Sequence, residues 1–272
     1  MGFISNILGR KGASQPETKP FLVMVALSAS VPITEGLVRK GLDELGSPTS
    51  LGDGSGKDGT LSCTILDSTQ RPGQQIGTMA LSLMPAPIPW MELESACARS
   101  WHWPEAAAVL QPHTRHWVIY VHAKSDPGYA SAIAVRITCG LLGQPGVLGI
   151  YVGSAGLVHS PEFWRANLDS EENACAADLW VHFAMEAFPD GTTSLRTQGL
   201  VNFGVMEIEM VHSRKPYEEM YERARELAGY LIYEGPVLAD GHTVGRTVDE
   251  KIIVRHEPSA YVPNEMVHRI YV

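Results

Sequence analysis

Hydrophobic positions along the chain follow two spacings, one typical of strands and one typical of helices. Residues 1–20 follow neither, and their Gly, Ser, Pro and Lys content predicts a flexible lead-in. Residues 21–27 are a continuous apolar run, which predicts a strand covered on both faces. From residue 34 to residue 45, Leu and Val recur at steps of three and four, which predicts a helix. The Gly-, Ser- and Asp-rich residues 46–59 are expected to form a loop.

Four further elements are predicted before residue 125. Two strands, a helix and a third strand fall at residues 60–67, 76–83, 90–100 and 117–121. The order is therefore strand, helix, strand, strand, helix, strand, which is the split arrangement of ferredoxin-like domains. Residues 21–125 are predicted to form one α+β half of this βαββαβ kind.

Residues 126–272 carry a second series of helices and strands. The clearest periodicity lies in residues 216–233, where apolar side chains recur at steps of three and four and predict an amphipathic helix. Asp190 and Gly191 predict a turn between two strands. Because several neighbouring strands need antiparallel pairing, the predicted class is α+β, with mixed, largely antiparallel sheets and helices packed on them. The two halves are expected to pack as one body.

The charge is concentrated in the second half of the chain. The formal net charge of the 272 residues is −9, and residues 136–272 account for −8 of it. Nucleic acids and anionic membranes both attract clustered Lys and Arg, so neither is expected as a partner. An acidic half favours a basic partner, or serves solubility alone. The oligomeric state is left open.

Cysteine spacing and hydropathy indicate the compartment. The four cysteines are widely separated and form no knuckle or redox motif, as expected for buried thiols in a reducing cytoplasm. The longest apolar run, residues 133–142, is interrupted by Arg136 and is too short to span a membrane. A cytoplasmic location is therefore expected.

Two acidic residues on a predicted strand are candidates for catalysis. Glu207 and Glu209 are two positions apart, so they share one face at a separation that general acid and base groups use. Asp240 and His242 add a second carboxylate and imidazole pair. A hydrolase-type site around these four residues is one hypothesis, and it requires them to converge in a cleft. A half-exposed strand that directs its glutamates to water explains the same alternation.

Other chemistry-bearing residues are weaker candidates. His113 and His116 lie three apart, but the chain has no HExxH and no paired CxxC, so no metal and no cofactor is expected. The aromatic patch Trp90, Trp101 and Trp103 is compatible with a pocket, a partner interface or the core.

The C-terminal segment resembles a known family. Residues 197–209, which read Thr-Gln-Gly-Leu-Val-Asn-Phe-Gly-Val-Met-Glu-Ile-Glu, are followed by the amphipathic helix and by the Gly-rich residues 235–245. This order resembles the bacterial domain-of-unknown-function family 4261 over residues 195–272. The resemblance implies no settled enzymatic activity. Members are similar in setting to proteins encoded near secretion-system toxins, which implies an immunity (toxin-neutralising) or adaptor protein.

The preferred hypothesis is a non-enzymatic protein-binding module that presents acidic side chains to a basic toxin or effector domain. Inhibitors of this kind gain fast association from electrostatic steering. The candidate partner-binding residues lie on the outer face of the amphipathic helix and in one acidic loop, and they are Glu218, Glu219, Glu222, Glu226, Asp169, Glu171 and Glu172. The alternative is the hydrolase-type site around Glu207, Glu209, Asp240 and His242.

Overall fold

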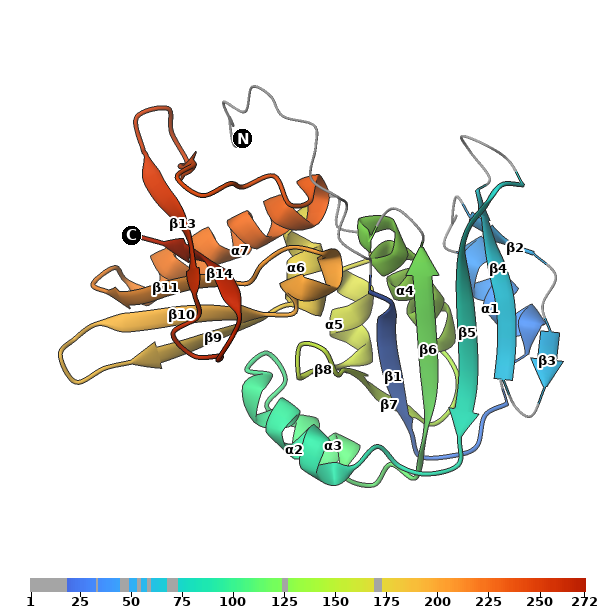
Figure 1. Cartoon of the computed structure of the whole chain (residues 1–272). Helices are drawn as coiled ribbons and strands as arrows, with labels where there is room; N and C mark the ends of the chain where they lie inside the picture. The colour runs from blue at the N-terminus through green and yellow to red at the C-terminus, as the bar shows by residue number, and fades with distance from the viewer. Residues whose placement is uncertain are drawn as a thin grey trace.

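Two β-sheets with helices packed on them make up the fold (Figure 1). The computed structural model describes residues 19–32, 34–44, 49–52, 55–57, 60–67, 73–123, 127–168 and 173–272. Both sheets are largely antiparallel, so the predicted α+β class is confirmed.

The first sheet has the strand order β2-β4-β5-β6-β1-β7-β8, with β3 paired to β4. Every described pairing in it is antiparallel. Its strands are β1 (Phe21–Leu27), β2 (Thr49–Leu51), β3 (Ser55–Lys57), β4 (Thr60–Asp67), β5 (Gln75–Met84), β6 (Arg115–Ala123), β7 (Val147–Val152) and β8 (Leu157–His159).

Helices cover this sheet on both faces. Helices α1 (Glu35–Glu44) and α4 (Pro127–Leu141) pack on one face, where Val23 and Val25 of β1 are buried with them. Helices α2 (Trp90–Arg99) and α3 (Ala106–Leu110) pack on the other face, against Ala26 of β1. Strand β1 is therefore covered on both of its faces, as its continuous apolar run predicts.

The predicted succession of strands and helices in residues 21–125 is observed, with β2, β3 and α3 in addition, but the ferredoxin-like arrangement of these strands in the sheet is wrong. In the structure β6 lies between β5 and β1 and runs antiparallel to both. Met84 at the end of β5 is opposite His116 near the start of β6. The short helices α2 and α3 therefore return the chain to the end of the sheet that it left, which gives an antiparallel neighbour instead of a crossover.

Two pairs of strands also differ from the sequence-based expectation. Strands β2 and β3 lie within residues 46–59, where a loop was expected, and both pair with β4. Strands β7 and β8 come from beyond residue 126 but complete the first sheet beside β1. The first sheet therefore draws on residues of both predicted halves.

The second sheet has the order β12-β13-β14-β11-β10-β9, and β11 runs parallel to β14. Its strands are β9 (His182–Ala187), β10 (Thr193–Gln198), β11 (Ile208–Ser213), β12 (Thr243–Val244), β13 (Ile252–Pro258) and β14 (Met266–Ile270). Helices α6 (Asn173–Trp180) and α7 (Tyr217–Glu234), with the 3-10 helix η1 (Leu200–Phe203), complete this part. Helix α5 (Pro161–Ala166) packs against β7 of the first sheet and against α4. The predicted turn at Asp190 and Gly191 joins β9 to β10.

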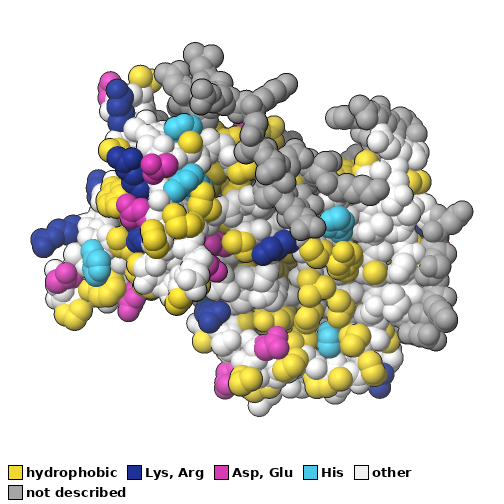
Figure 2. All heavy atoms as spheres, viewed as in Figure 1, with side chains coloured by type: hydrophobic (Ala, Val, Ile, Leu, Met, Phe, Trp, Pro, Cys, Tyr) yellow, Lys and Arg dark blue, Asp and Glu magenta, His cyan; other side chains and the backbone are white. Residues whose placement is uncertain are grey.

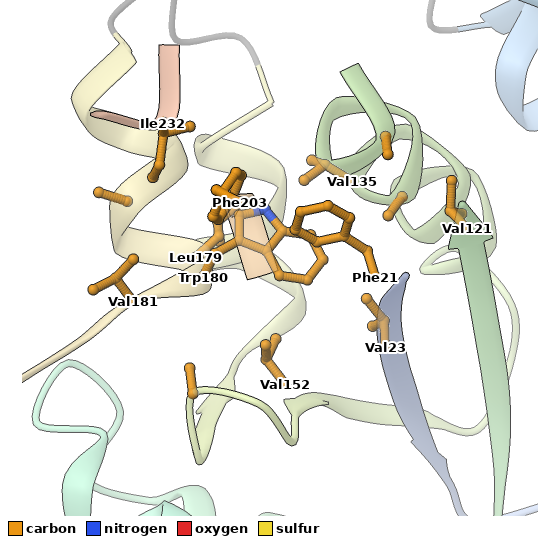
Figure 3. Close-up of a cluster of buried hydrophobic side chains, with 14 of the residues drawn as sticks. Phe21, Val23, Val121, Val135, Val152, Leu179, Trp180, Val181, Phe203 and Ile232 are labelled. Carbon is orange, nitrogen blue, oxygen red and sulfur yellow. The ribbon is translucent and has the colours of Figure 1, made fainter. Parts of the chain in front are cut away.

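The two sheets share one hydrophobic core. The ring of Phe21 in β1 meets Trp180 of α6 and Phe203 of η1 edge to face, each at a centroid distance of 4.9 Å (Figure 3). Trp180 in turn meets Trp164 of α5 at 5.8 Å. Such edge-to-face contacts add to the free energy gained by burying the rings. The first strand of the chain is thus packed against helices of the C-terminal part.

Candidate functional site

A hollow of about 650 Å³ lies where the two sheets meet. The connection from α2 to α3, β8 and α5 line one side, and α6, β9 and α7 line the other. We call it the inter-sheet pocket. Its size is that of a small-molecule or side-chain site. Six of its lining side chains are aromatic rings: Trp101, His102, Phe163, Phe183, Tyr217 and Tyr221.

A pair of histidines stiffens one wall of the pocket. His159 Nε2 lies 3.1 Å from the carbonyl oxygen of Leu179, and a carbonyl only accepts, so this nitrogen carries the proton. His159 Nδ1 then accepts from His102 Nε2 at 3.0 Å. Burial, and then His102, lower the pKa of His159 to about 3, so it is neutral at pH 7. The ring of His102 also stacks on Phe163 at 4.1 Å, which fixes its position.

A bidentate ion pair closes the opposite side. Arg225 of α7 donates from Nε to Asp178 Oδ1 at 2.9 Å and from Nη2 to Oδ2 at 2.7 Å. Two parallel charge-assisted bonds hold α6 and α7 in a fixed orientation. Burial, and then the charge of Asp178, raise the pKa of Tyr221 to about 12, so its phenol stays protonated. The Phe183 ring meets Tyr221 edge to face at 5.4 Å.

The rim of the pocket carries exposed rings beside carboxylates. Trp101 is 75% exposed and Tyr217 is 54% exposed, which is unusual for side chains of this size. One stripe of α7 lines the pocket, with Glu218 and Glu222 one turn apart on it. Glu218 has no ionic partner among the described residues. The rim therefore offers aromatic faces and negative charge together.

Basic groups occupy another part of the lining. Burial, and then the charges of Arg99 and Arg196, lower the pKa of His182 to about 4. The Arg99 guanidinium lies against the turn between β7 and β8, where a Cβ on Gly156 would stand 2.6 Å from Nη1. Gly156 has a φ of +62°, so a glycine suits this turn for both reasons. The pocket therefore contains charges of both signs.

The four glutamates of α7 that are predicted to bind a partner differ in their ion pairs and in whether they line the pocket. Glu219 pairs with Lys215 at 3.0 Å, and Glu226 pairs with Arg246 at 2.8 Å. Glu222 lies 3.5 Å from Arg246 but is largely exposed. Of the four, Glu218 and Glu222 line the pocket. The predicted loop residues Asp169, Glu171 and Glu172 lie outside the described residues.

Glu207 and Glu209 are both buried, so the interpretation of a half-exposed strand is wrong for them. Glu207 accepts from Thr197 Oγ1 at 2.6 Å and from the backbone N–H groups of Gly199 and Val201 at 2.8 and 3.2 Å. Burial raises the pKa of Glu207, and these hydrogen bonds oppose the shift. Glu209 pairs with the buried Arg269 at 3.0 Å.

The other two residues of the hydrolase hypothesis lie in the turn before β12. Asp240 accepts from the backbone N–H of His256 at 2.9 Å, and His242 Nδ1 accepts from that of Ala239 at 3.2 Å. None of the four hypothesised catalytic residues lines the inter-sheet pocket. Their catalytic role stays a prediction, and each has a local structural partner.

The aromatic patch noted in the sequence divides between core and surface. Trp103 is buried and Trp90 packs partly against the same cluster, whereas Trp101 projects at the pocket rim. His102, Asp178 and Arg225 were not predicted as site residues, because they come from three separate segments. The cluster of Trp and His at residues 101–103 is the local sequence feature that points to this pocket. Within the described part of the chain, no three His, Cys, Asp or Glu side chains are grouped to hold a metal ion.

Comparison with known proteins identifies one segment. Residues 196–271 match a family described as Domain of unknown function (DUF4261), which confirms the resemblance predicted for residues 195–272. No curated protein matches the chain, and no solved structure does. Among the residues placed by the structure, no helix combines the length and hydrophobicity needed to cross a membrane. The matched segment begins in β10, so it supplies α7 but neither α6 nor β9.

Proposed function

We propose that this protein is a protein-binding module that docks a basic partner at the inter-sheet pocket. The observation that carries the proposal is the lining of this one pocket, which brings Glu218 and Glu222 of α7 together with the exposed rings of Trp101 and Tyr217. Carboxylates steer a basic partner and select it by charge. Exposed Trp and Tyr rings supply the large contact areas that dominate binding energy, and their faces attract Lys and Arg.

Charged side chains are distributed unevenly over the surface. Figure 2 shows charged side chains of both signs gathered over the second sheet, whereas the first sheet presents mostly hydrophobic and uncharged side chains in the same view. Within α7, Glu219 and Glu226 are paired with cations of the same chain at 3.0 and 2.8 Å, whereas Glu222 has a longer contact of 3.5 Å with Arg246 and is largely exposed. The docking charge is therefore assigned to Glu218 and Glu222.

We further propose that the partner is a toxin or effector domain of a bacterial secretion system, which makes this chain an immunity or adaptor protein. The support is the match of residues 196–271 to the family, together with the setting that the resemblance implies. An acidic surface is suited to cover a basic active site.

Site-specific photo-crosslinking in the native host tests the docking surface. A photoreactive phenylalanine analogue replaces Trp101 or Tyr217 at the rim. The control position is Tyr233, which is exposed on the last turn of the same helix and lies outside the pocket lining. We expect one protein to crosslink from both rim positions and not from position 233. Equal crosslinking from all three positions would contradict the proposal.

Charge reversal then tests the role of the two glutamates with the purified crosslinked protein. We expect E218K/E222K to weaken its binding by at least about tenfold, because two attractive contacts become repulsive. The control E234K reverses one charge on the same helix, at an exposed position outside the pocket. Equal affinity for the double variant and the control would place the docking surface elsewhere.

A further inference from the structure

The second sheet ends in an open edge along the inter-sheet pocket. Among the described residues β9 pairs with β10 alone, and β9 forms the lower border of this sheet in Figure 1. Its residues His182, Phe183 and Met185 line the pocket. With six residues, β9 is longer than the edge strands β2 and β8, which have three, and β12, which has two.

The register identifies the backbone groups that face outward. Phe188 N–H donates to the carbonyl of Thr192 just beyond the ends of the two strands. In an antiparallel pair, bonded and non-bonded positions alternate, so every second residue from there bonds to β10. Ala187, Met185 and Phe183 are the intervening residues, and their N–H and C=O groups point away from β10. No described residue forms a hydrogen bond with these groups.

The neighbouring edge of the first sheet, at β8, is covered by another element. The backbone N–H of Val158 in β8 donates to Ser100 Oγ at 2.9 Å, so the end of α2 covers that edge. Proteins commonly block open edges with Lys, Pro or a bulge, because unpaired strands recruit other chains. The sequence of β9, His-Phe-Ala-Met-Glu-Ala, has neither Lys nor Pro, and its pairing with β10 is regular.

We infer that the open edge of β9 binds an extended basic segment of the partner as an added strand. This inference rests on the proposed function and specifies how the partner binds. Strand addition supplies main-chain hydrogen bonds for affinity and leaves alternate side chains for specificity. Phe183 and Met185, whose backbone groups point away from β10, both line the pocket, and the added segment would run there.

Charge complementarity defines the segment. The Phe183 ring contacts Tyr221 of α7, so the side chains of Phe183 and Met185 lie on the α7 face of the sheet. Residues of an added strand opposite them project to the same face. There they meet the stripe of α7 that carries Glu218 and Glu222. The segment is therefore expected to carry Lys or Arg at every second position.

The substitution M185P tests the main-chain contact. Proline removes an outward N–H of the edge strand and leaves the bonds to β10 in place, because position 185 does not donate to β10. The matched control M185A shortens the same side chain but keeps the N–H. The probe is a synthetic peptide of alternating lysine and valine, titrated into each variant. We expect M185P to bind at least about tenfold more weakly than M185A.

A second measurement applies even if M185P fails to fold. Peptide binding to the wild-type protein is expected to slow amide hydrogen exchange at Phe183 and Met185, which are open in the free protein. Ala184 and Glu186 already bond to β10 and should change little. Peptides N-methylated at one alternate set of amides should lose binding, whereas those methylated at the other set should keep it.

The outcomes separate this inference from the proposed function. Binding that is weakened by E218K/E222K, with no effect of M185P and no added protection at Phe183 and Met185, would overturn strand addition and leave the proposed docking surface intact. A wild-type protein that does not bind the peptide would also overturn strand addition, while crosslinking at Trp101 tests the docking surface independently. A dimer that M185P dissociates would assign the edge to a second copy and overturn the inference.

Discussion

Glu207 is a buried carboxylate held by donors from its own neighbourhood. The chain turns at Gly199 with a φ of +129°, where a Cβ would stand 2.1 Å from the carbonyl oxygen of Trp180. This turn presents the N–H groups of Gly199 and Val201 to the carboxylate. In E207Q the new NH₂ group can donate to the Thr197 hydroxyl, but the N–H groups of Gly199 and Val201 then donate to a neutral carbonyl oxygen in place of a charged carboxylate. We expect a loss of about 1 to 3 kcal/mol of unfolding free energy, measured by urea denaturation.

The matched control for this prediction is E186Q, which makes the same chemical change at an exposed position of β9. A surface substitution of this kind should change stability by less than about 0.5 kcal/mol. An E207Q variant as stable as E186Q would show that the charge of the buried carboxylate contributes no net stability.

His268 makes the stability of the fold depend on pH. Burial, and then His256, lower the pKa of His268 to about 4, whereas an unfolded histidine has a pKa of about 6.5. Between these values the unfolded chain binds a proton that the folded chain excludes. The unfolding free energy therefore falls as the pH is lowered through this window. The slope of the unfolding free energy against pH gives the number of protons that the unfolded chain binds in excess of the folded chain. We expect H268L to lower this number by about one across the window.

The control for the pH experiment is the neighbouring buried residue Val267. V267A leaves a cavity and lowers stability without removing a titrating group, so it should shift the stability curve and keep its slope. The same slope in H268L and in the wild-type protein would mean that His268 takes up its proton equally in both states.

At the scale of elements, the Asp178–Arg225 pair joins α6 to α7 beside the pocket. Both side chains are partly buried and the contact is bidentate, so the pair should contribute more than a surface pair. We expect a double-mutant cycle with D178A and R225A to give a coupling energy of about 1 to 2 kcal/mol. The i,i+4 pair Glu35–Arg39 in α1 is more exposed and should give about 0.3 to 0.5 kcal/mol. Equal coupling energies in the two cycles would contradict this ranking.

Elements with a strong local pattern could be predicted from the sequence, but their neighbours could not. Helix α7 lies within one residue of its predicted bounds, because its apolar spacing and Pro216 both mark it. The pairing of β5 with β6 depends on the end of the sheet to which α2 and α3 return the chain. The spacing of apolar residues does not indicate that end. The burial of Glu207 does not follow from the alternation for a similar reason, since its donors come from the turn at Gly199 and from Thr197.

At the scale of the whole molecule, the inter-sheet pocket is assembled from segments that are distant in sequence. Its lining comes from residues 99–102, 157–163, 178–185 and 217–225. The sequence predicted the acidic stripe of α7, because a helical pattern is local. It could not show that Trp101 stands at the same rim, since that contact exists only after the two sheets have packed together. For the same reason the sequence could not separate Glu218 from Glu219.

Because the pocket exists only when the two sheets pack together, truncation of a side chain in their shared core should destabilise both sheets. Phe21 is 1% exposed and contacts Trp180 and Phe203, whereas its neighbour Leu22 is 38% exposed on the same strand. We expect F21A to lower the unfolding free energy by about 3 to 5 kcal/mol and L22A to lower it by much less. Amide hydrogen exchange should accelerate together in β6 of the first sheet and β10 of the second. Acceleration confined to β6 would mean that the two sheets unfold independently, because the contact of Phe21 with Trp180 and Phe203 would then not couple them.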